Sequence, residues 1–292
     1  MDSYNTLFAT DQDCISYLFH KRWPTGFCCP FCNRHQKEIA PAHTVVCRYC
    51  RKQSSITANT LMHGSKKSLA EWMQVAAQFC FSTKGISARS LQNSFQIATY
   101  QTAWNWLKKM RKAAAIAESA RLNGPVHIIA TTTGNNNKSS YKYISRIACL
   151  MDTPKHTNQQ GRIRLRSFPD TSATTLPDFI LQAVTRGASI TGSKSILRKL
   201  TTIEHVYQLH ITNSENEDAT ALFNELQQWM SFLYRGATDP KYLQDYLDEF
   251  CFRHNTATWN NRLAILDHLL TGIMVAETVP PQHTPATTPG GA

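Results

Sequence analysis

Four cysteines in two CxxC pairs are the residues of this 292-residue chain whose types and spacing most clearly indicate chemistry. Cys29 and Cys32 form one pair, Cys47 and Cys50 form the other, and fourteen residues separate the pairs. Each CxxC turn directs two thiolates at one point, so two such turns complete a closed tetrahedral zinc site. We expect structural Zn²⁺ here, because four thiolates leave no open position for a substrate. Metal binding would supply much of the folding free energy of so small a segment.

Three further potential ligands, Cys28, His35 and His43, lie close to the pairs, and we interpret them as bystanders. The four thiolates already satisfy the metal, and a proline follows Cys29, where the turn favours it. A redox role for one CxxC pair is the alternative, but no βαβ pattern surrounds either pair. Only four of the nine cysteines fall into a paired spacing, so metal binding is favoured over a disulfide framework.

The formal net charge of +11 is concentrated in the first part of the chain. The first 124 residues carry sixteen Lys and Arg against six Asp and Glu, whereas the remaining 168 carry fifteen against fourteen. This asymmetry indicates that the N-terminal part binds a polyanion such as nucleic acid. A basic surface that serves only solubility is the alternative.

A helix-turn-helix is the element expected to use this charge. Apolar residues recur at helical spacing over residues 68–81, and a short helix at 88–95 is followed by a turn near 96–98 and a longer helix from residue 100. The expected N-caps of these helices are Ser68, Ser87 and Thr99. In the last helix we expect Trp104, Leu107 and Met110 to pack inward.

The second helix of such a unit lies in the major groove of double-stranded DNA, with its N-terminal residues at base edges. Tyr100, Gln101 and Asn105 can read bases there, and the basic residues further along suit phosphates. The residues expected to contact DNA are Arg89, Tyr100, Gln101, Asn105, Lys108, Lys109, Arg111 and Lys112. An amphipathic helix with a solvated basic face is the alternative.

The sequence contains no run of eighteen apolar residues, and its first twenty residues carry three aspartates and no Lys or Arg. We therefore expect neither a membrane span nor a secretory signal. The expectation is a cytoplasmic protein that is nucleoid-associated when bound to DNA.

The periodicity changes after residue 125 and indicates a mixed α/β layer. Strands are predicted at residues 126–133, 141–151, 162–168, 188–191 and 204–211, and helices at 176–186, 218–234, 241–253 and 260–272. We therefore divide the chain into a zinc ribbon with an N-terminal extension (1–57), a helical helix-turn-helix domain (58–123), an α/β mixed-sheet domain with C-terminal helices (124–275) and a disordered tail (276–292).

Several sequence landmarks resemble those of a known family. They are WPTGFCCPFC, VVCRYCRKQ, KGISA, TAWNWLKKMR, TTLPDFILQAV, NELQQWMSFLYRG and YLQDYLDEFCFRHN. Over residues 23–268 the chain resembles the zinc-ribbon insertion-sequence transposases of the Merlin-like, or ISXO-like, group. The resemblance implies a ribonuclease-H-like fold for the third domain, a homodimer, and DDE-type strand transfer in which carboxylates hold two divalent ions.

The resemblance also implies that the catalytic carboxylates are substituted. The first aspartate of the family pattern falls on Ile129, and the second falls on Gly192. On the late helix the family's asparagine matches Asn224, whereas its glutamate falls on Gln227. Mg²⁺ is a hard cation that selects anionic oxygen ligands, so we expect no Mg²⁺ at these degenerate positions.

Realignment does not restore the acids, because residues 119–151 and 179–203 contain no Asp or Glu. We interpret the chain as a transposase-derived, catalytically inactive DNA-binding protein, which is a transposon-end binder or a regulatory relic. One alternative is an active transposase that recruits other acids, foremost Asp152 and Asp170, which would approach one another from the ends of their strands. The other candidate acids are Glu204, Glu215, Glu217, Asp218 and Glu225. A protein-interaction scaffold, in which the zinc ribbon binds protein, is the second alternative.

Overall fold

The computed structural model forms two compact units. The larger unit comprises Gln74–Gly272, and the N-terminal unit comprises Met1–Met73 together with Ile273–Ala292. The described residues are 8–133, 145–152, 161–168, 175–212, 217–234 and 239–275. The disordered tail predicted at residues 276–292 lies outside them. No helix within these ranges is long and apolar enough to cross a membrane.

The N-terminal unit contains one helix followed by two short antiparallel hairpins. These elements are α2 (Asp11–Arg22), β1 (Phe27–Cys28) paired with β2 (His35–Gln36), and β3 (Thr44–Val46) paired with β4 (Gln53–Ser55). A capping box starts α2, because the Thr10 hydroxyl accepts the Asp13 N–H while the Asp13 carboxylate accepts the Thr10 N–H. Phe19, Trp23 and Phe27 then pack edge to face, which joins the end of α2 to the first hairpin.

Three helices follow the hairpins: α3 (Leu69–Phe81), α4 (Ala88–Ser94) and α5 (Tyr100–Ala117). Each begins after its predicted N-cap, Ser68, Ser87 or Thr99, whose hydroxyl accepts a backbone N–H three residues later. In the turn between α4 and α5, Gln96 adopts a left-handed conformation with a φ of 49°. The predicted order of helix, turn and helix is therefore present.

The buried face of α5 differs from the prediction at one tryptophan. Leu107 and Met110 are buried as expected, but Trp106, not Trp104, is buried with them. Trp104 is half-exposed, and its ring packs edge-on against Tyr242 of α9 (Pro240–Thr256) with 4.9 Å between centroids. Because α5 packs against both α4 and α9, its apolar surface is wider than one stripe, and Trp104 packs on the side that faces α9.

The larger unit contains a five-stranded sheet in the order β7-β6-β5-β8-β9. Its strands are β5 (Val126–Thr133), β6 (Ser145–Asp152), β7 (Ile163–Phe168), β8 (Ser189–Gly192) and β9 (Gln208–Ile211). β5, β6 and β7 are antiparallel, whereas β8 and β9 run parallel to β5. β9 is shorter than predicted, because Tyr207 turns inward and its hydroxyl donates to the Val184 carbonyl at 3.2 Å.

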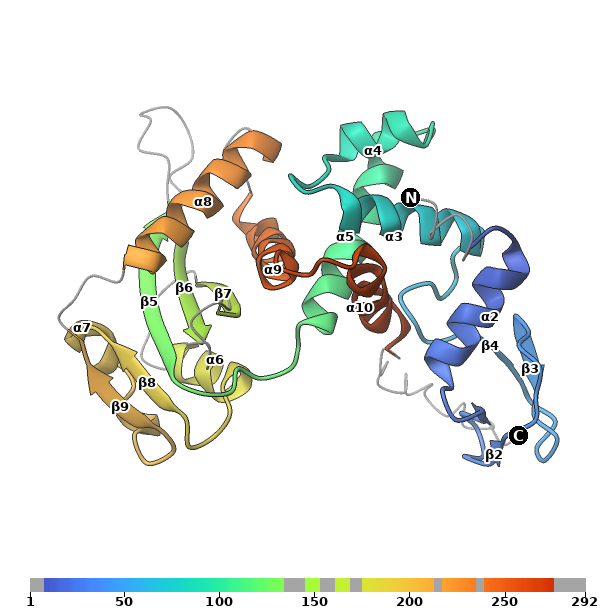
Figure 1. Ribbon diagram of the computed structural model, residues 1–292, viewed down its shortest axis with the longest axis horizontal. Helices are drawn as coiled ribbons and strands as arrows, with labels where there is room; N and C mark the ends of the chain where they lie inside the picture. Colours follow the sequence, from blue (N-terminus) through green and yellow to red (C-terminus); the bar gives the residue numbers. More distant parts are fainter. Residues whose placement is uncertain are drawn as a thin grey trace, which may run out of the picture. The chain divides into compact units, whose positions relative to one another are not determined.

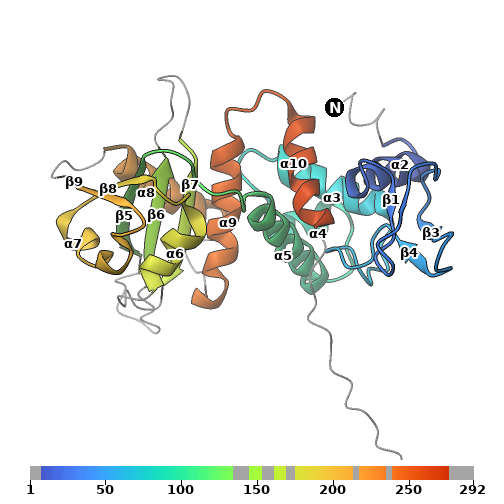
Figure 2. The ribbon, with the colours of Figure 1, turned by 90° about the horizontal axis from the view of Figure 1, so that it is seen from below.

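Helices cover both faces of this sheet. The helices not yet given are α6 (Thr175–Ala183), α7 (Lys194–Leu197), α8 (Glu217–Tyr234) and α10 (Arg262–Met274). α6 and α7 pack on the face that carries Ile128 and Ile190, and α8 and α9 pack over Cys149 and Leu165 on the opposite face. Figure 1 and Figure 2 show α6 and α8 on opposite sides of the strands. This layered arrangement confirms the predicted α/β fold class and is consistent with a ribonuclease-H-like domain.

Candidate functional site

The four cysteines of the CxxC pairs come together in the N-terminal unit, and their Sγ atoms all lie within 4.8 Å of one another. The Cys29 and Cys50 sulfurs are 3.6 Å apart, and the Cys32 and Cys47 sulfurs are 3.7 Å apart. Zinc bound tetrahedrally by four thiolates at about 2.3 Å requires Sγ–Sγ distances of about 3.8 Å. The four side chains therefore fit the structural Zn²⁺ that their spacing predicts.

The two CxxC turns share one backbone geometry. The Cys29 N–H donates to the Arg34 carbonyl at 3.1 Å, and the Cys47 N–H donates to the Lys52 carbonyl at 3.0 Å. The residue after the second cysteine of each turn has a positive φ; these residues are Asn33 (56°) and Arg51 (62°). Residues at equivalent places in the two turns are therefore presented in the same way.

Gln36 supports the zinc centre, and nothing in the sequence singled it out. Its side chain is buried; Nε2 donates to the Cys47 Sγ at 3.3 Å, and Oε1 accepts the Arg48 N–H at 3.2 Å. The backbone N–H groups of Cys50 and Tyr49 lower the pKa of the Cys47 thiol, which favours the thiolate that zinc binds. A single glutamine carries no spacing signal, so only the fold reveals this contact.

The three bystanders stand apart from the thiolate cluster, as predicted. The Cys28 sulfur faces the Asn33 carbonyl at 3.9 Å. The His35 ring lies 3.3 Å from the Thr25 hydroxyl, and His43 is an exposed residue of the following segment. None of them is placed to replace a cysteine.

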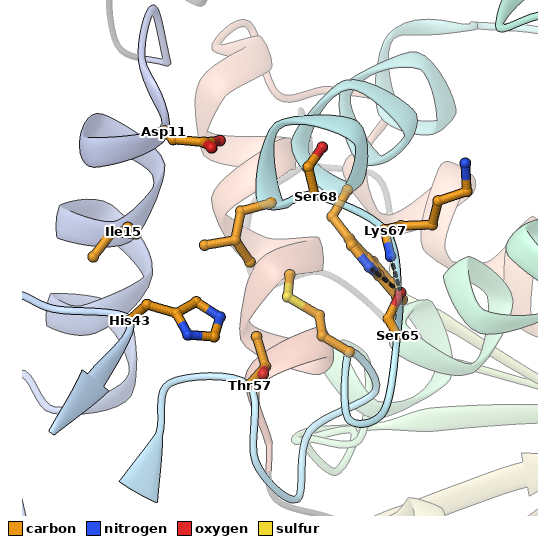
Figure 3. A pocket seen from close by; sticks show the side chains of 10 residues that line it. Asp11, Ile15, His43, Thr57, Ser65, Lys67 and Ser68 are labelled. Carbon is orange, nitrogen blue, oxygen red and sulfur yellow. Dashed lines mark hydrogen bonds between the residues drawn. The ribbon is translucent and has the colours of Figure 1, made fainter.

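A hollow in the N-terminal unit lies between α2 and the loop that precedes α3. Figure 3 shows His43 on one side of it and Ser65 and Lys67 on the other. The Ser65 hydroxyl accepts the Lys67 N–H at 3.2 Å and the Trp72 indole N–H at 3.1 Å, so these polar groups are paired within the wall. No predicted site residue lines this hollow, and we do not assign it to the candidate site.

One face of α5 carries an exposed polar stripe, at the helical spacing that places residues on one side. The stripe consists of Gln101, Asn105, Lys108 and Lys112. The Gln101 Nε2 donates to the Asn105 Oδ1 at 3.1 Å, so the two amides form one polar group near the start of the helix. Beside them, the Arg89 guanidinium of α4 lies 5.4 Å from the exposed Tyr100 ring. The arrangement fits a recognition helix, with amides and aromatic first and lysines further along.

Arg111 does not lie on this stripe, contrary to the DNA contact predicted for it. Only 3% of Arg111 is exposed, and its Nε donates to the buried Glu249 carboxylate of α9 at 2.8 Å. Its guanidinium also lies 4.3 Å from the Tyr246 ring. A buried and paired guanidinium is not available to a phosphate, so Arg111 is removed from the proposed DNA contacts. Lys109 is half-exposed on the same helix.

The positions matched to the catalytic carboxylates lie on neighbouring elements. Ile129 of β5 pairs with Cys149 and lies on the face of the sheet that α8 and α9 cover. Gly192 ends β8 and is in register with Ile128 of β5. Asn224 and Gln227 are exposed residues of α8, one turn apart. The fold thus places β5 and β8 side by side, with uncharged residues at all four positions.

Gly192 is closely packed by its neighbour on β5. A Cβ at this position would lie 2.7 Å from the Ile128 Cγ2 and 3.2 Å from the Ile128 carbonyl oxygen. The first distance is shorter than a van der Waals contact, so even a methyl group requires Ile128 to move. An aspartate at Gly192 would therefore also require Ile128 to move.

The strand register places Asp152 and Phe168 at opposite ends of β6. Asp152 pairs with Val126 at the amino end of β5, whereas Phe168 pairs with Arg146 at the other end of β6. Phe168 is the last described residue before Asp170, and both Asp170 and Glu215 lie outside the described residues. The register gives no support to an approach of Asp152 and Asp170.

A four-thiolate ribbon, a helix-turn-helix and a layered mixed sheet define a zinc-ribbon protein with a ribonuclease-H-like domain. Comparison with protein families identifies it more closely: residues 9–53 match a transposase zinc-ribbon domain, and residues 122–255 match an ISXO2-like transposase domain. These two segments of the chain are therefore similar to domains of transposases. Comparison with curated proteins found no match.

Proposed function

We propose that this protein is a transposase-derived DNA-binding protein that occupies or regulates transposon ends and does not catalyse strand transfer. The proposal rests on the three positions at which the family pattern has catalytic carboxylates, because this chain has Ile129, Gly192 and Gln227 there. Two Mg²⁺ ions need anionic oxygen ligands, and neutral side chains do not offset the cost of removing the ions from water. The residues present do not fit the metal pair of a DDE-type enzyme.

The surroundings of these positions support the proposal. The strand register puts Asp152 at the amino end of β5, and any side chain at Gly192 would require Ile128 to move. Within the described ranges, the zinc cysteines form the one group of three or more His, Cys, Asp or Glu side chains that could share a metal ion. The described residues therefore hold no group of three or more such side chains in place of the missing carboxylates.

Duplex binding is assigned to the α4–α5 turn and the polar stripe of α5. The proposed contacts are Arg89, Tyr100, Gln101, Asn105, Lys108, Lys109 and Lys112. The first 124 residues carry the charge excess that phosphate binding requires, with sixteen Lys and Arg against six Asp and Glu. In this proposal the amides read bases, and the lysines provide affinity that depends on salt.

The proposal is tested by selection of bound duplexes from a random-sequence DNA pool with the full-length, zinc-loaded protein. The selected duplex is then incubated with protein, a supercoiled target plasmid, and Mg²⁺ or Mn²⁺. We expect enrichment of a sequence and steep loss of affinity with salt, but no joined product above a reaction with EDTA. Joined product with the wild-type protein overturns the loss of catalysis.

A variant of α5 tests whether its polar stripe reads the DNA sequence. Gln101→Ala with Asn105→Ala should abolish the enrichment while the protein remains folded and retains zinc, because both side chains are exposed. Absence of any salt-dependent duplex binding by the wild-type protein overturns the DNA-binding part of the proposal and favours the scaffold alternative.

A further inference from the structure

Each CxxC turn exposes a large aromatic ring between its two cysteines. Phe31 is 55% exposed, and Tyr49 is 59% exposed. Neither ring is a zinc ligand, and exposure of so much apolar surface opposes solubility. Their places in the two turns are equivalent, because each is the residue before the second cysteine. The pair is therefore a repeated feature of the ribbon that zinc binding does not explain.

A cation from the opposite turn lies over each ring. The Lys52 Nζ is 4.9 Å from the centre of the Phe31 ring, and the Arg34 guanidinium is 5.1 Å from the centre of the Tyr49 ring. Arg34 and Lys52 are themselves equivalent, since their carbonyls accept the same N–H bond in the two turns. The ribbon thus presents two crossed pairs of aromatic and cation, which we call the knuckle surface (Phe31, Arg34, Tyr49 and Lys52).

The charge around the knuckle surface favours an anionic partner. Residues 27–55 contain five Lys and Arg and one acidic residue, Glu38. All five cations are exposed; they are Arg34, Lys37, Arg48, Arg51 and Lys52. A zinc ion with four thiolates carries two negative charges, so the segment keeps a net positive charge when zinc is bound.

We propose that the knuckle surface binds unpaired DNA bases, as in a single strand or an opened DNA end. Exposed aromatic faces beside cations are the combination that binds single strands, because bases stack on the rings while the cations meet phosphates. In a duplex the base faces are covered by their neighbours, so a duplex offers these rings no equivalent contact. The inference rests on the proposed function in taking DNA as the partner, but it concerns a surface separate from α5.

The test measures fluorescence anisotropy of a labelled oligothymidylate of about 20 nucleotides, a length above the site size of about 4–16 nucleotides for a stacking surface. The full-length, zinc-loaded protein is compared with Phe31→Ala, Tyr49→Ala and the double variant, with a duplex of equal length measured in parallel. Each single variant should weaken oligothymidylate binding on the order of tenfold. Duplex binding should not change. Val46→Ala is the matched control, because Val46 is an exposed apolar residue of the same ribbon.

Leucine and tryptophan replacements distinguish stacking from apolar docking. Phe31→Trp with Tyr49→Trp should retain oligothymidylate binding, whereas Phe31→Leu with Tyr49→Leu should lose it. Retained binding in the leucine variant, or an equal loss in Val46→Ala, overturns the proposal. Zinc content is measured for every variant. Arg34→Gln with Lys52→Gln provides a second test, since it should reduce the slope of log affinity against log salt by about 0.7 for each phosphate that is no longer neutralised.

The proposals for the duplex-binding surface and for the knuckle surface can be disproved independently of one another. If Gln101→Ala with Asn105→Ala abolishes duplex selection but leaves oligothymidylate binding intact, the duplex and knuckle surfaces are distinct, as proposed. Duplex selection by a protein that does not bind oligothymidylate overturns the knuckle inference alone.

Discussion

Asp248 on α9 is a residue whose ionisation the fold opposes. Burial raises the pKa of Asp248 to about 6, and the nearby Asp245 adds to the shift, against a hydrogen bond from Gln244 and the charges of Arg164 and Arg166. The folded pKa lies above the unfolded value of about 3.9. Between these two pKa values the folded protein keeps a proton that the unfolded chain releases. The stability cost of the buried charge is therefore absent below about pH 4 and complete above the folded pKa.

Asp248→Asn should therefore stabilise the protein at neutral pH. The amide retains an oxygen that accepts the Gln244 bond without a buried charge. We expect the free energy of unfolding to rise by up to about 3 kcal/mol at pH 7.5 and to change little at pH 4, measured by urea denaturation at both pH values. Glu204→Gln, at an exposed residue, is the control. An equal effect of Asp248→Asn at the two pH values would contradict this origin.

At the scale of elements, local signals in the sequence predicted most of what the structure contains. The helix starts were predictable from the N-caps Ser68, Ser87 and Thr99, because the hydroxyl of a cap accepts a backbone N–H only three residues later. The burial of Arg111 was not predictable, because its partner Glu249 lies 138 residues further along the chain. Nothing local distinguishes a buried arginine from an exposed one on a basic helix. For the same reason, Gln36 gave no sign of its contact with a zinc ligand.

The zinc ribbon should depend on its metal. Cys47→Ser removes a ligand whose thiolate is stabilised by Gln36, so this variant should lose bound zinc and the order of the two hairpins. Cys28→Ser should retain one zinc per chain, because the Cys28 sulfur faces the Asn33 carbonyl and lies outside the thiolate cluster. Metal content by mass spectrometry, with circular dichroism before and after chelation, measures both. Zinc loss from Cys28→Ser would show that the ligand set is wrong.

We expect the residues of the polar stripe on α5 to have two roles, with the two amides reading bases and the two lysines contacting phosphates. Lys108→Ala and Lys112→Ala should each reduce the slope of log affinity against log salt by about one, with uniform weakening across sequences. Gln101→Ala and Asn105→Ala should instead reduce discrimination between the selected duplex and a random one by about 1–3 kcal/mol. Lys194→Ala, at an exposed residue of α7, is the charge control. Uniform weakening by all four variants would contradict the division.

At the scale of the larger unit, buried ion pairs make α5 part of the same body as the sheet. Arg111 of α5 and Arg253 of α9 both pair with Glu249, and Arg253 also donates to the Phe79 carbonyl of α3 at 3.0 Å. A duplex bound along α5, as proposed, would therefore be held at a fixed position relative to the adjacent inner strands β5 and β8.

A second buried cluster connects the C-terminal end of α5 to α9 and α10. Glu118 is buried; its carboxylate accepts the Asn255 Nδ2 at 2.6 Å and lies 2.7 Å from the His268 Nε2. Burial opposes the charges of Glu118 and Glu249, but the surrounding donors and arginines lower both pKa values. The folded values lie below the unfolded value of about 4.3, so this stabilisation is complete above that pH and is lost as the pH falls through the folded pKa.

The two roles considered for Arg111, a buried link or a phosphate contact, predict different results for one pair of substitutions. Glu249→Leu alone leaves Arg111 and Arg253 without their shared carboxylate and should cost about 3–5 kcal/mol of stability, measured by urea denaturation. Addition of Arg111→Met removes one buried charge and should recover part of that loss. The double variant should also keep the wild-type salt slope for duplex binding, unlike Lys108→Ala. A slope reduced by about one in the double variant would instead show that Arg111 leaves Glu249 to reach a phosphate.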